Sequence, residues 1–404
     1  MNYSKLTIFL NILLSPFFSF LSSLFPKGNI VLLGTYSRHK YGENTKYLFE
    51  YLAKKEDIDA YWITDNKQII THLKNSGFNH IGLRSPIKMF WILLRAKIII
   101  DSGTGYFNPF GVLNTNKVIK ISTLHGNGPK ATVSRYIAAI DGGGIKEILN
   151  HHQFNYVNYP SNYSAIKVGR RNHLLPNEKI ISLGYPRCDQ YFDKDLVTQF
   201  YKNKKTAQSL CSDYKSNSKI ILYTPTWRPY EYNFPLDQMD GMDLNTFDQW
   251  LDSNNIFFFF SVHTAHQPEN IPKGLKKIIY IDPSSSPFFD INEFMMEVDI
   301  LINDYSTTST EFSLLNRPQL FFMPDYHHYN AEKGFVEDYR HLLPGKEIVN
   351  YNDLISSLNL IFKDEKGYID KYNEKRTELL DKYYDLKTGD SAKLFYSFIK
   401  NILN

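Results

Sequence analysis

The stretch from which the fold can be inferred is residues 300–318, ILINDYSTTSTEFSLLNRP. It begins with a short apolar run, Ile300–Ile302, which is typical of a buried parallel strand. The apolar residues after the hydroxyl-rich block predict a short helix and then another strand. The block therefore lies where a helix begins, and unpaired backbone N–H groups and the positive end of the helix dipole occur at such a place.

Two interpretations of the hydroxyl-rich block follow. Ser306, Thr307 and Thr308 add small hydroxyl donors to the start of the helix, which predicts a site for a phosphate or diphosphate. Alternatively, Asp304 or Ser306 only caps the helix. The stretch by itself leaves both interpretations open.

Strands alternate with helices in two series along the chain. The predicted strands are 30–33, 60–63, 97–101 and 118–124 in the first series, and 219–224, 256–262, 277–281, 300–302 and 319–322 in the second. Helices are predicted at 44–54, 67–74 and 85–95. This alternation predicts an α/β protein with parallel sheets. Two such domains imply a cleft between them in which ligands bind.

The chain has 404 residues, which suits two domains. We expect the first at 29–195 and the second at 218–350, with a hinge in the polar segment between them and further helices at 351–404. The net charge of +4 gives no reason to expect nucleic acid as a partner. Two cysteines form no disulfide framework and predict a reducing compartment, and the sequence contains no metal-binding motif.

Residues 1–28 contain an uncharged segment, 6–25, that predicts a membrane-associated hydrophobic helix. Four polar residues at helical spacing, Asn11, Ser15, Ser19 and Ser22, form a narrow stripe that favours a helix lying on or in the membrane surface. A spanning helix and an arm packed on its own domain are the alternatives. A cleaved signal peptide is disfavoured because a strand follows almost immediately.

Several residues at strand ends are candidates for chemistry. His125 and His263 each follow a predicted strand, one in each domain, and neutral imidazole is a common general base. His266 competes with His263 for that position. Arg228 follows the first strand of the second domain and is a candidate phosphate clamp, although a proline-stiffened turn explains it equally well. Residues 184–189, GYPRCD, permit a local Arg–Asp ion pair with a structural role.

The order of these motifs resembles the CDP-glycerol glycerophosphotransferase family, whose enzymes prime or polymerise teichoic-acid-type chains and related capsule polymers. The matching segments are His125-Gly126 with Lys130, then Gly184–Asp189, Pro225–Arg228, Asp290–Glu293, Asp304–Thr307, and Asp325 with Tyr329, Lys333-Gly334 and Asp338. The chain departs from the family's pattern at Pro129, Ser261, Thr264, Glu311 and Lys333. Lysine in place of arginine at Lys333 removes bidentate phosphate geometry.

The resemblance implies a GT-B-like fold and transfer of glycerol phosphate, or a related polyol phosphate, from a CDP-activated donor to an acceptor hydroxyl, with release of CMP. It assigns the acceptor to the domain at 29–195 and the nucleotide donor to the domain at 218–350. It implies a lipid-linked or saccharide acceptor, a place on the cytoplasmic face of the cell membrane, and no cofactor or metal. A GT-B glycosyltransferase using a nucleotide sugar and an inactive membrane-bound polymer-binding protein are the alternatives.

The resemblance also implies roles for individual residues. The general base would be His125, and His263 would stabilise charge on the transferring or leaving phosphate. The diphosphate would bind Ser306, Thr307 and Thr308. Further donor contacts are expected from Arg228, Glu311 (to the ribose) and Lys333, with Asp304 and Lys130 in support.

Overall fold

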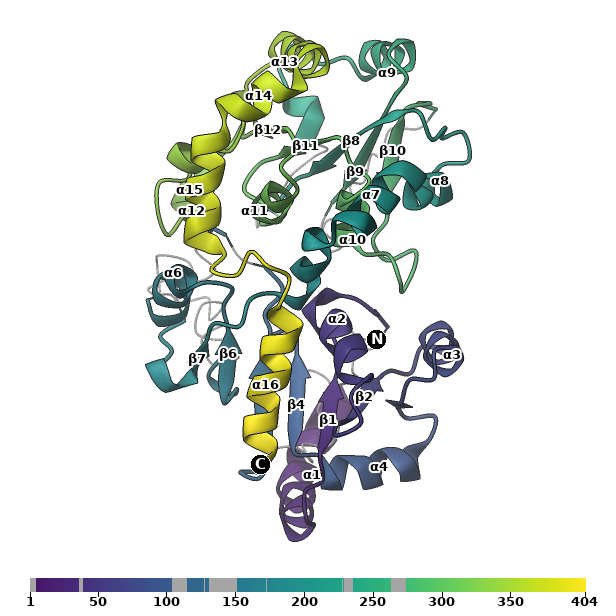
Figure 1. Ribbon diagram of the computed structural model, residues 1–404, viewed down its shortest axis with the longest axis vertical. Coiled ribbons are helices and arrows are strands. Elements are labelled where there is room, and N and C mark those ends of the chain that lie inside the picture. The colour runs from purple at the N-terminus through teal and green to yellow at the C-terminus, as the bar shows by residue number, and fades with distance from the viewer. Residues whose placement is uncertain are drawn as a thin grey trace. The chain divides into compact units, whose positions relative to one another are not determined.

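A computed structural model describes residues 5–35, 39–103, 115–126, 128–130, 151–171, 173–226, 228, 235–262 and 274–404. The chain divides into two compact units (Figure 1). The first comprises Met1–His125, Ile140–Asp189 and Thr388–Asn404, and the second comprises Gly126–Ala139 and Gln190–Lys387. His263, Trp227 and Thr264 lie outside the described residues.

The first unit contains a seven-stranded sheet in the order β3-β2-β1-β4-β5-β6-β7, with every pairing parallel. The strands are β1 (Ile30–Leu33), β2 (Asp59–Ile63), β3 (His80–Ile81), β4 (Ile98–Asp101), β5 (Ile119–Ser122), β6 (Tyr156–Asn158) and β7 (Ile180–Ile181). Strand β1 is buried along its whole length, as expected of a strand covered on both faces. The predicted parallel α/β architecture is confirmed for this unit.

Helices of the first unit are α1 (Lys5–Leu24), α2 (Glu43–Leu52), α3 (Lys67–Asn75), α4 (Pro86–Arg95), α6 (Asn162–Ser164) and α16 (Ser391–Leu403), with a π-helix at Ala165–Arg170. Helix α16 packs against α2, where Tyr396 and Lys400 both bond to Asp57. The last helix of the chain therefore belongs to the first unit. The rest of the predicted helical segment at 351–404 belongs to the second.

The second unit contains a six-stranded parallel sheet in the order β10-β9-β8-β11-β12-β13. The strands are β8 (Lys219–Thr224), β9 (Ile256–Ser261), β10 (Ile278–Ile281), β11 (Ile300–Asn303), β12 (Gln319–Phe322) and β13 (Lys346–Ile348). In sequence order this is the 3-2-1-4-5-6 arrangement of the Rossmann fold. Strand β8 therefore pairs with both β9 and β11, and the chain reverses direction across the sheet between β8 and β11.

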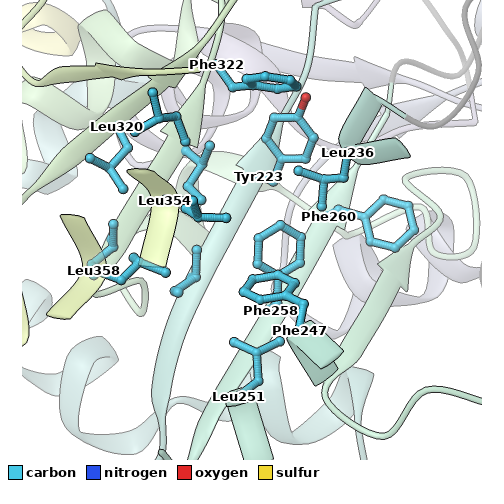
Figure 2. Packing of buried hydrophobic residues seen from close by; sticks show 14 of the residues in the cluster. Tyr223, Leu236, Phe247, Leu251, Phe258, Phe260, Leu320, Phe322, Leu354 and Leu358 are labelled. Atoms are coloured by element: carbon cyan, nitrogen blue, oxygen red, sulfur yellow. The ribbon is translucent and has the colours of Figure 1, made fainter. Parts of the chain in front are cut away.

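Helices of the second unit are α7 (Lys194–Asn203), α8 (Lys205–Leu210), α9 (Leu244–Ser253), α10 (Ile291–Met295), α11 (Thr308–Phe312), α12 (Tyr326–Glu332), α13 (Tyr351–Lys363), α14 (Glu365–Lys371) and α15 (Asn373–Tyr383). Figure 2 shows Phe247 of α9 and Leu354 of α13 packed with Tyr223 and Phe258 of the sheet. Alternate residues of β8 and β9 point to this side, as the two-residue repeat of a strand requires.

The polar segment predicted to hold the hinge, 192–218, contains helices α7 and α8. Two acidic residues of the second unit hold this segment. The backbone N–H groups of Thr206 and Ala207 each donate to Glu297 at 2.9 Å. Lys204 pairs with Asp299 at 2.9 Å, and both side chains are buried. These buried acidic side chains anchor the segment, which is part of the second unit.

Helix α1 rests on the first unit through one of its faces. Phe18 and Leu21 pack against the apolar cluster beneath α4, and the Phe18 ring lies 5.6 Å from that of Phe90. Within the described part of the chain, no helix has the length and apolarity that crossing a membrane requires. The opposite face of α1 carries exposed apolar side chains at Leu13, Phe17, Phe20 and Leu24.

Candidate functional site

The carboxyl ends of β8 and β11 mark the switch point of the second sheet, which is where ligands bind in folds of this type. Thr224 ends β8 and Asn303 ends β11. Both contact the hydroxyl-rich block: the hydroxyls of Thr224 and Thr308 lie 2.8 Å apart, and Asn303 Nδ2 donates to Thr308 Oγ1 at 3.1 Å. The predicted block therefore lies at the switch point itself.

The three hydroxyl residues predicted to bind phosphate are those that reach the surface. Ser306, Thr307 and Thr308 are half-buried, whereas Ser309 and Thr310 are buried. Thr307 occupies the N-cap position of α11 and makes no side-chain cap bond. Ser306 Oγ accepts only a long bond of 3.5 Å from the Thr308 N–H. Capping by Ser306 therefore has little support, whereas Asp304 accepts bonds from backbone N–H groups of the turn before the helix. Because α11 has only five residues, its dipole contributes less than that of a longer helix.

Asp304 shapes the turn in front of the block. Its carboxylate accepts bonds from the backbone N–H groups of Tyr305 and Ser306, the latter at 3.1 Å. It also accepts from the N–H of Thr226 at 2.9 Å and from its hydroxyl at 2.7 Å. Asp304 is 1% exposed, so these bonds take the place of solvent. The carboxylate thereby ties the turn after β8 to the turn after β11.

The position of Arg228 favours a supporting role over the phosphate clamp that we predicted. The guanidinium is fully buried and donates to Asp304 at 2.5 Å. Its other two nitrogens donate to Asp325 at 2.8 and 2.9 Å. The cation also lies 4.9 Å from the ring centroid of Tyr305 and 5.3 Å from that of Tyr329. With all three nitrogens bonded inside the protein, Arg228 holds Asp304 in place beneath the turn.

Two tyrosines complete this buried network. Tyr305 OH donates to Asp325 Oδ1 at 3.1 Å, and Tyr339 OH donates to the backbone carbonyl of Asp304 at 2.8 Å. Burial, followed by the charges of Asp325 and Asp304, raises the pKa of Tyr305. Its hydroxyl therefore remains a hydrogen-bond donor at any physiological pH.

The backbone at Gly126 and Gly128 lies against the hydroxyl-rich block. A Cβ on Gly126 would lie 2.9 Å from Thr307 Oγ1, and one on Gly128 would lie 3.3 Å from its methyl group. A side chain at either position would push the backbone away from Thr307, so glycine permits this close approach. Lys130 then forms an antiparallel bridge with Phe335, two residues after Lys333. The bridge brings Lys130 and the segment carrying Lys333 together.

Lys130 is a predicted residue of this region whose pKa is shifted by burial. Burial lowers the pKa of its amine to about 8, while the negative charge of Asp304 acts in the opposite direction. The amine therefore titrates just above neutral pH. A ligand that brings negative charge would favour its protonated form.

In the first unit, His125 follows β5 as predicted. Its Nδ1 lies 3.3 Å from the carbonyl oxygen of Ser102. When Nδ1 carries the proton and donates to that carbonyl, Nε2 of the neutral ring is the basic nitrogen. The predicted local pair between Arg187 and Asp189 is wrong. Arg187 pairs with Glu43 at 3.0 Å, and Asp189 accepts from the N–H groups of Ser391 and Ala392 at the start of α16.

Glu311 is 1% exposed and lies in the first turn of α11.

Sequence reasoning missed Thr226 and Asn303 as residues that position the site, and it included Asp325 only as part of a motif. Their signal was present but weak: each lies beside a strand end or inside a short polar motif. Among the described residues, no group of three or more His, Cys, Asp or Glu side chains could hold a metal ion.

The comparisons with known proteins agree with the resemblance. The family model described as CDP-Glycerol:Poly(glycerophosphate) glycerophosphotransferase matches residues 17–401. The chain is 26% identical over 400 residues to a teichoic acid glycerol-phosphate transferase of Staphylococcus aureus, covering 93% of this chain and 94% of that protein. It is 26% identical over 364 residues to the teichoic acid glycerol-phosphate primase of Bacillus subtilis, covering 86% and 81% respectively.

A solved structure of the wall teichoic acid polymerase TagF is similar along the whole chain. It superposes with a TM-score of 0.71 at 19% sequence identity, and the match covers 99% of each chain. At this identity the likeness establishes the fold, which is α/β with parallel sheets and GT-B-like.

Proposed function

Because the chain belongs to the CDP-glycerol:poly(glycerophosphate) glycerophosphotransferase family, we propose that it transfers glycerol phosphate, or a related polyol phosphate, from a CDP-activated donor to an acceptor hydroxyl in the synthesis of a teichoic-acid-like or capsular polymer. The observation that carries this proposal is the hydroxyl-rich turn at the switch point of the second sheet. The attacking oxygen forms a bond to the donor's distal phosphorus, the bond to the CMP oxygen breaks, and CMP leaves.

The donor diphosphate would bind the second unit at the turn that Asp304 organises. Ser306, Thr307 and Thr308 offer hydroxyls there, and Thr307 lies against the backbone at Gly126. Lys130 would add a positive charge, because a diphosphate raises the pKa of its amine. Lys333 would add a second cation and Glu311 would accept from a ribose hydroxyl. Charge stabilisation by fixed donors is usually the largest contribution to catalysis of this kind.

The acceptor would meet His125 of the first unit. With Nδ1–H donating to the Ser102 carbonyl, Nε2 would take the proton of the attacking hydroxyl. His263 would stabilise charge on the transferring or leaving phosphate. The catalytic groups would then be two histidines supported by fixed hydrogen-bond donors.

A panel of donors tests this proposal. We expect CDP-glycerol or CDP-ribitol to raise the melting temperature, since a ligand at 100 times its dissociation constant adds roughly 2.7 kcal/mol to the stability. UDP-sugars and a CMP-sugar should have no effect. Release of CMP in the presence of an acceptor would then identify the reaction. Stabilisation by a UDP-sugar alone would instead favour a nucleotide-sugar glycosyltransferase, and no response to any donor would favour a binding protein.

We also propose that the exposed face of α1 lies on the cytoplasmic surface of the membrane, where a lipid-linked acceptor would be found. Leu13, Phe17, Phe20 and Leu24 follow helical spacing and are each more than 60% exposed. Apolar side chains in such a stripe favour the boundary between headgroups and acyl chains.

Helix α4 extends the same surface. Its Ile87 is 86% exposed, and its Trp91 is 49% exposed and packs against Phe25 with ring centroids 5.7 Å apart. The Arg95 guanidinium lies 5.7 Å from the centre of the Trp91 ring. A tryptophan beside an arginine suits the boundary between water and anionic lipid.

A further inference from the structure

Arg187 links the start of α2 to the backbone of His125. Its side chain is 5% exposed, and its guanidinium donates to Glu43 Oε2 at 3.0 Å. The other terminal nitrogen donates to the carbonyl oxygen of His125 at 2.8 Å. The guanidinium is rigid and planar, so these two bonds fix its orientation and thereby the position of the His125 carbonyl.

Asn44, the neighbour of Glu43, makes a second connection to the same loop. Its side chain is fully buried, and Nδ2 donates to the carbonyl of Leu124 at 3.0 Å and to that of Thr123 at 3.4 Å. Its Oδ1 accepts from the N–H of Arg187 at 3.3 Å. Asn44 and the Glu43–Arg187 pair therefore hold three consecutive carbonyls, those of residues 123–125.

Backbone strain occurs at two places in this arrangement. Glu43 has φ of +65° and Leu124 has φ of +55°, both in the left-handed region that side chains other than glycine rarely adopt. Such strain persists only where the surrounding contacts enforce it, and it is concentrated at functional sites. Here one strained residue directly precedes His125 and the other supplies the carboxylate that orients Arg187.

We infer that Glu43 is a positioning residue of the transfer reaction, acting through Arg187 on the backbone of His125. The inference rests on the proposed role of His125 as the base. The Ser102 carbonyl fixes the ring of His125, and the Glu43–Arg187 pair fixes its main chain. A base held from both sides keeps Nε2 aligned with the acceptor hydroxyl.

The test compares Glu43→Gln with Glu50→Gln. Both are glutamates of α2, and Glu50 accepts a bond from Tyr41 OH at 2.9 Å away from the histidine. Glu43→Gln should lower kcat by about tenfold to a hundredfold with little change in donor affinity, because small misplacements of a reacting group have effects of this size. Glu43→Asp should recover part of the loss. Glu50→Gln should behave like the wild type.

A double-mutant cycle separates positioning from general stabilisation. In a His125→Ala background, Glu43→Gln should have no further effect on kcat, because the group that it positions is absent. An equal loss in both backgrounds, or a kcat within about twofold of the wild type, would overturn the inference.

Hydrogen exchange gives a readout that does not depend on activity. Backbone amides at 121–126 should exchange faster in Glu43→Gln than in Glu50→Gln, because the loop has lost its anchor. Faster exchange with no transfer from any donor would mean that the proposed function fails while the positioning contact is real. If the wild type transfers glycerol phosphate but Glu43→Gln changes neither exchange nor kcat, the proposed function holds and the positioning role of Glu43 is wrong.

Discussion

Replacing Asp304 with asparagine tests the network beneath the hydroxyl-rich turn. The Asp304 carboxylate and the Arg228 guanidinium are 1% and 0% exposed and lie 2.5 Å apart. Asparagine keeps one carbonyl oxygen for the turn but places an amide against the guanidinium and removes the charge. Removing one partner of a buried ion pair typically costs about 3–5 kcal/mol. Because Asp325 still pairs with Arg228 at 2.8 Å, we expect a loss of about 3 kcal/mol, near the lower end of that range.

Calorimetry measures this loss directly. For a unit of about 200 residues, a change of 3 kcal/mol corresponds to a fall in melting temperature of roughly 6–12 °C. Asp252→Asn is the matched control, since it breaks an ion pair with Lys277 at 3.2 Å in which the aspartate is 55% exposed. That exposed pair should contribute less than about 1 kcal/mol.

Donor binding can be measured in the same two variants, Asp304→Asn and Asp252→Asn. Loss of the charge should loosen the turn and weaken donor binding, because Asp304 holds the N–H group of Ser306. If Asp304→Asn melts within about 2 °C of the wild type, as its control should, the buried network does not hold the turn and the reasoning is refuted.

Four further predictions follow from the proposed function. Thr307→Ala should weaken donor binding by about 1–3 kcal/mol. Thr307→Glu should nearly abolish donor binding without lowering the melting temperature. If calorimetric titration finds wild-type affinity in Thr307→Glu, the proposed phosphate site is wrong. Raising the pH from 7 to 9 should weaken donor binding about tenfold, because Lys130, with its pKa lowered to about 8, loses its charge over that range, and Lys130→Met should abolish this pH dependence. His125→Ala should reduce turnover by about 10²- to 10⁴-fold at unchanged donor affinity, as measured by CMP release. Phe17→Glu should reduce sedimentation with anionic vesicles, whereas Leu360→Glu, at an exposed position of α13, should leave it unchanged.

The central strands could be predicted from the sequence because apolar runs are the signature of buried parallel strands. Strand β8 has the predicted bounds, and β11 differs by one residue. The strands that were missed, β3, β6, β7 and β13, have only two or three residues each, which is too short to show a period. The helices at 194–210 were missed for another reason. Their stability comes from bonds to Glu297 and Asp299, which lie about 90 positions away in the sequence.

The placement of the hydroxyl-rich block at the end of a central strand was also predictable, because strand ends and helix starts are local features. The environment of Arg228 was not. An arginine after a strand has the same local appearance whether it faces a ligand or a carboxylate. Arg228 faces carboxylates because it meets Asp304 and Asp325, which lie 76 and 97 positions further along the chain. Only the folded sheet, in which β8 and β11 are neighbours, brings these charges together.

Because these long-range contacts bury Arg228, the motifs that match the family include residues that support the site from inside the protein. Arg228, Asp304 and Asp325 come from three separate segments that match the family, and their side chains meet in a single buried network. The half-buried residues Ser306 and Thr307 follow closely after the Asp304 carboxylate that this network holds. A fixed turn is what charge stabilisation requires, because donors that are already oriented need no rearrangement during the reaction. If the proposed function holds, the buried motifs would contribute to catalysis by fixing the turn, and the residues beside them would provide the contacts to phosphate.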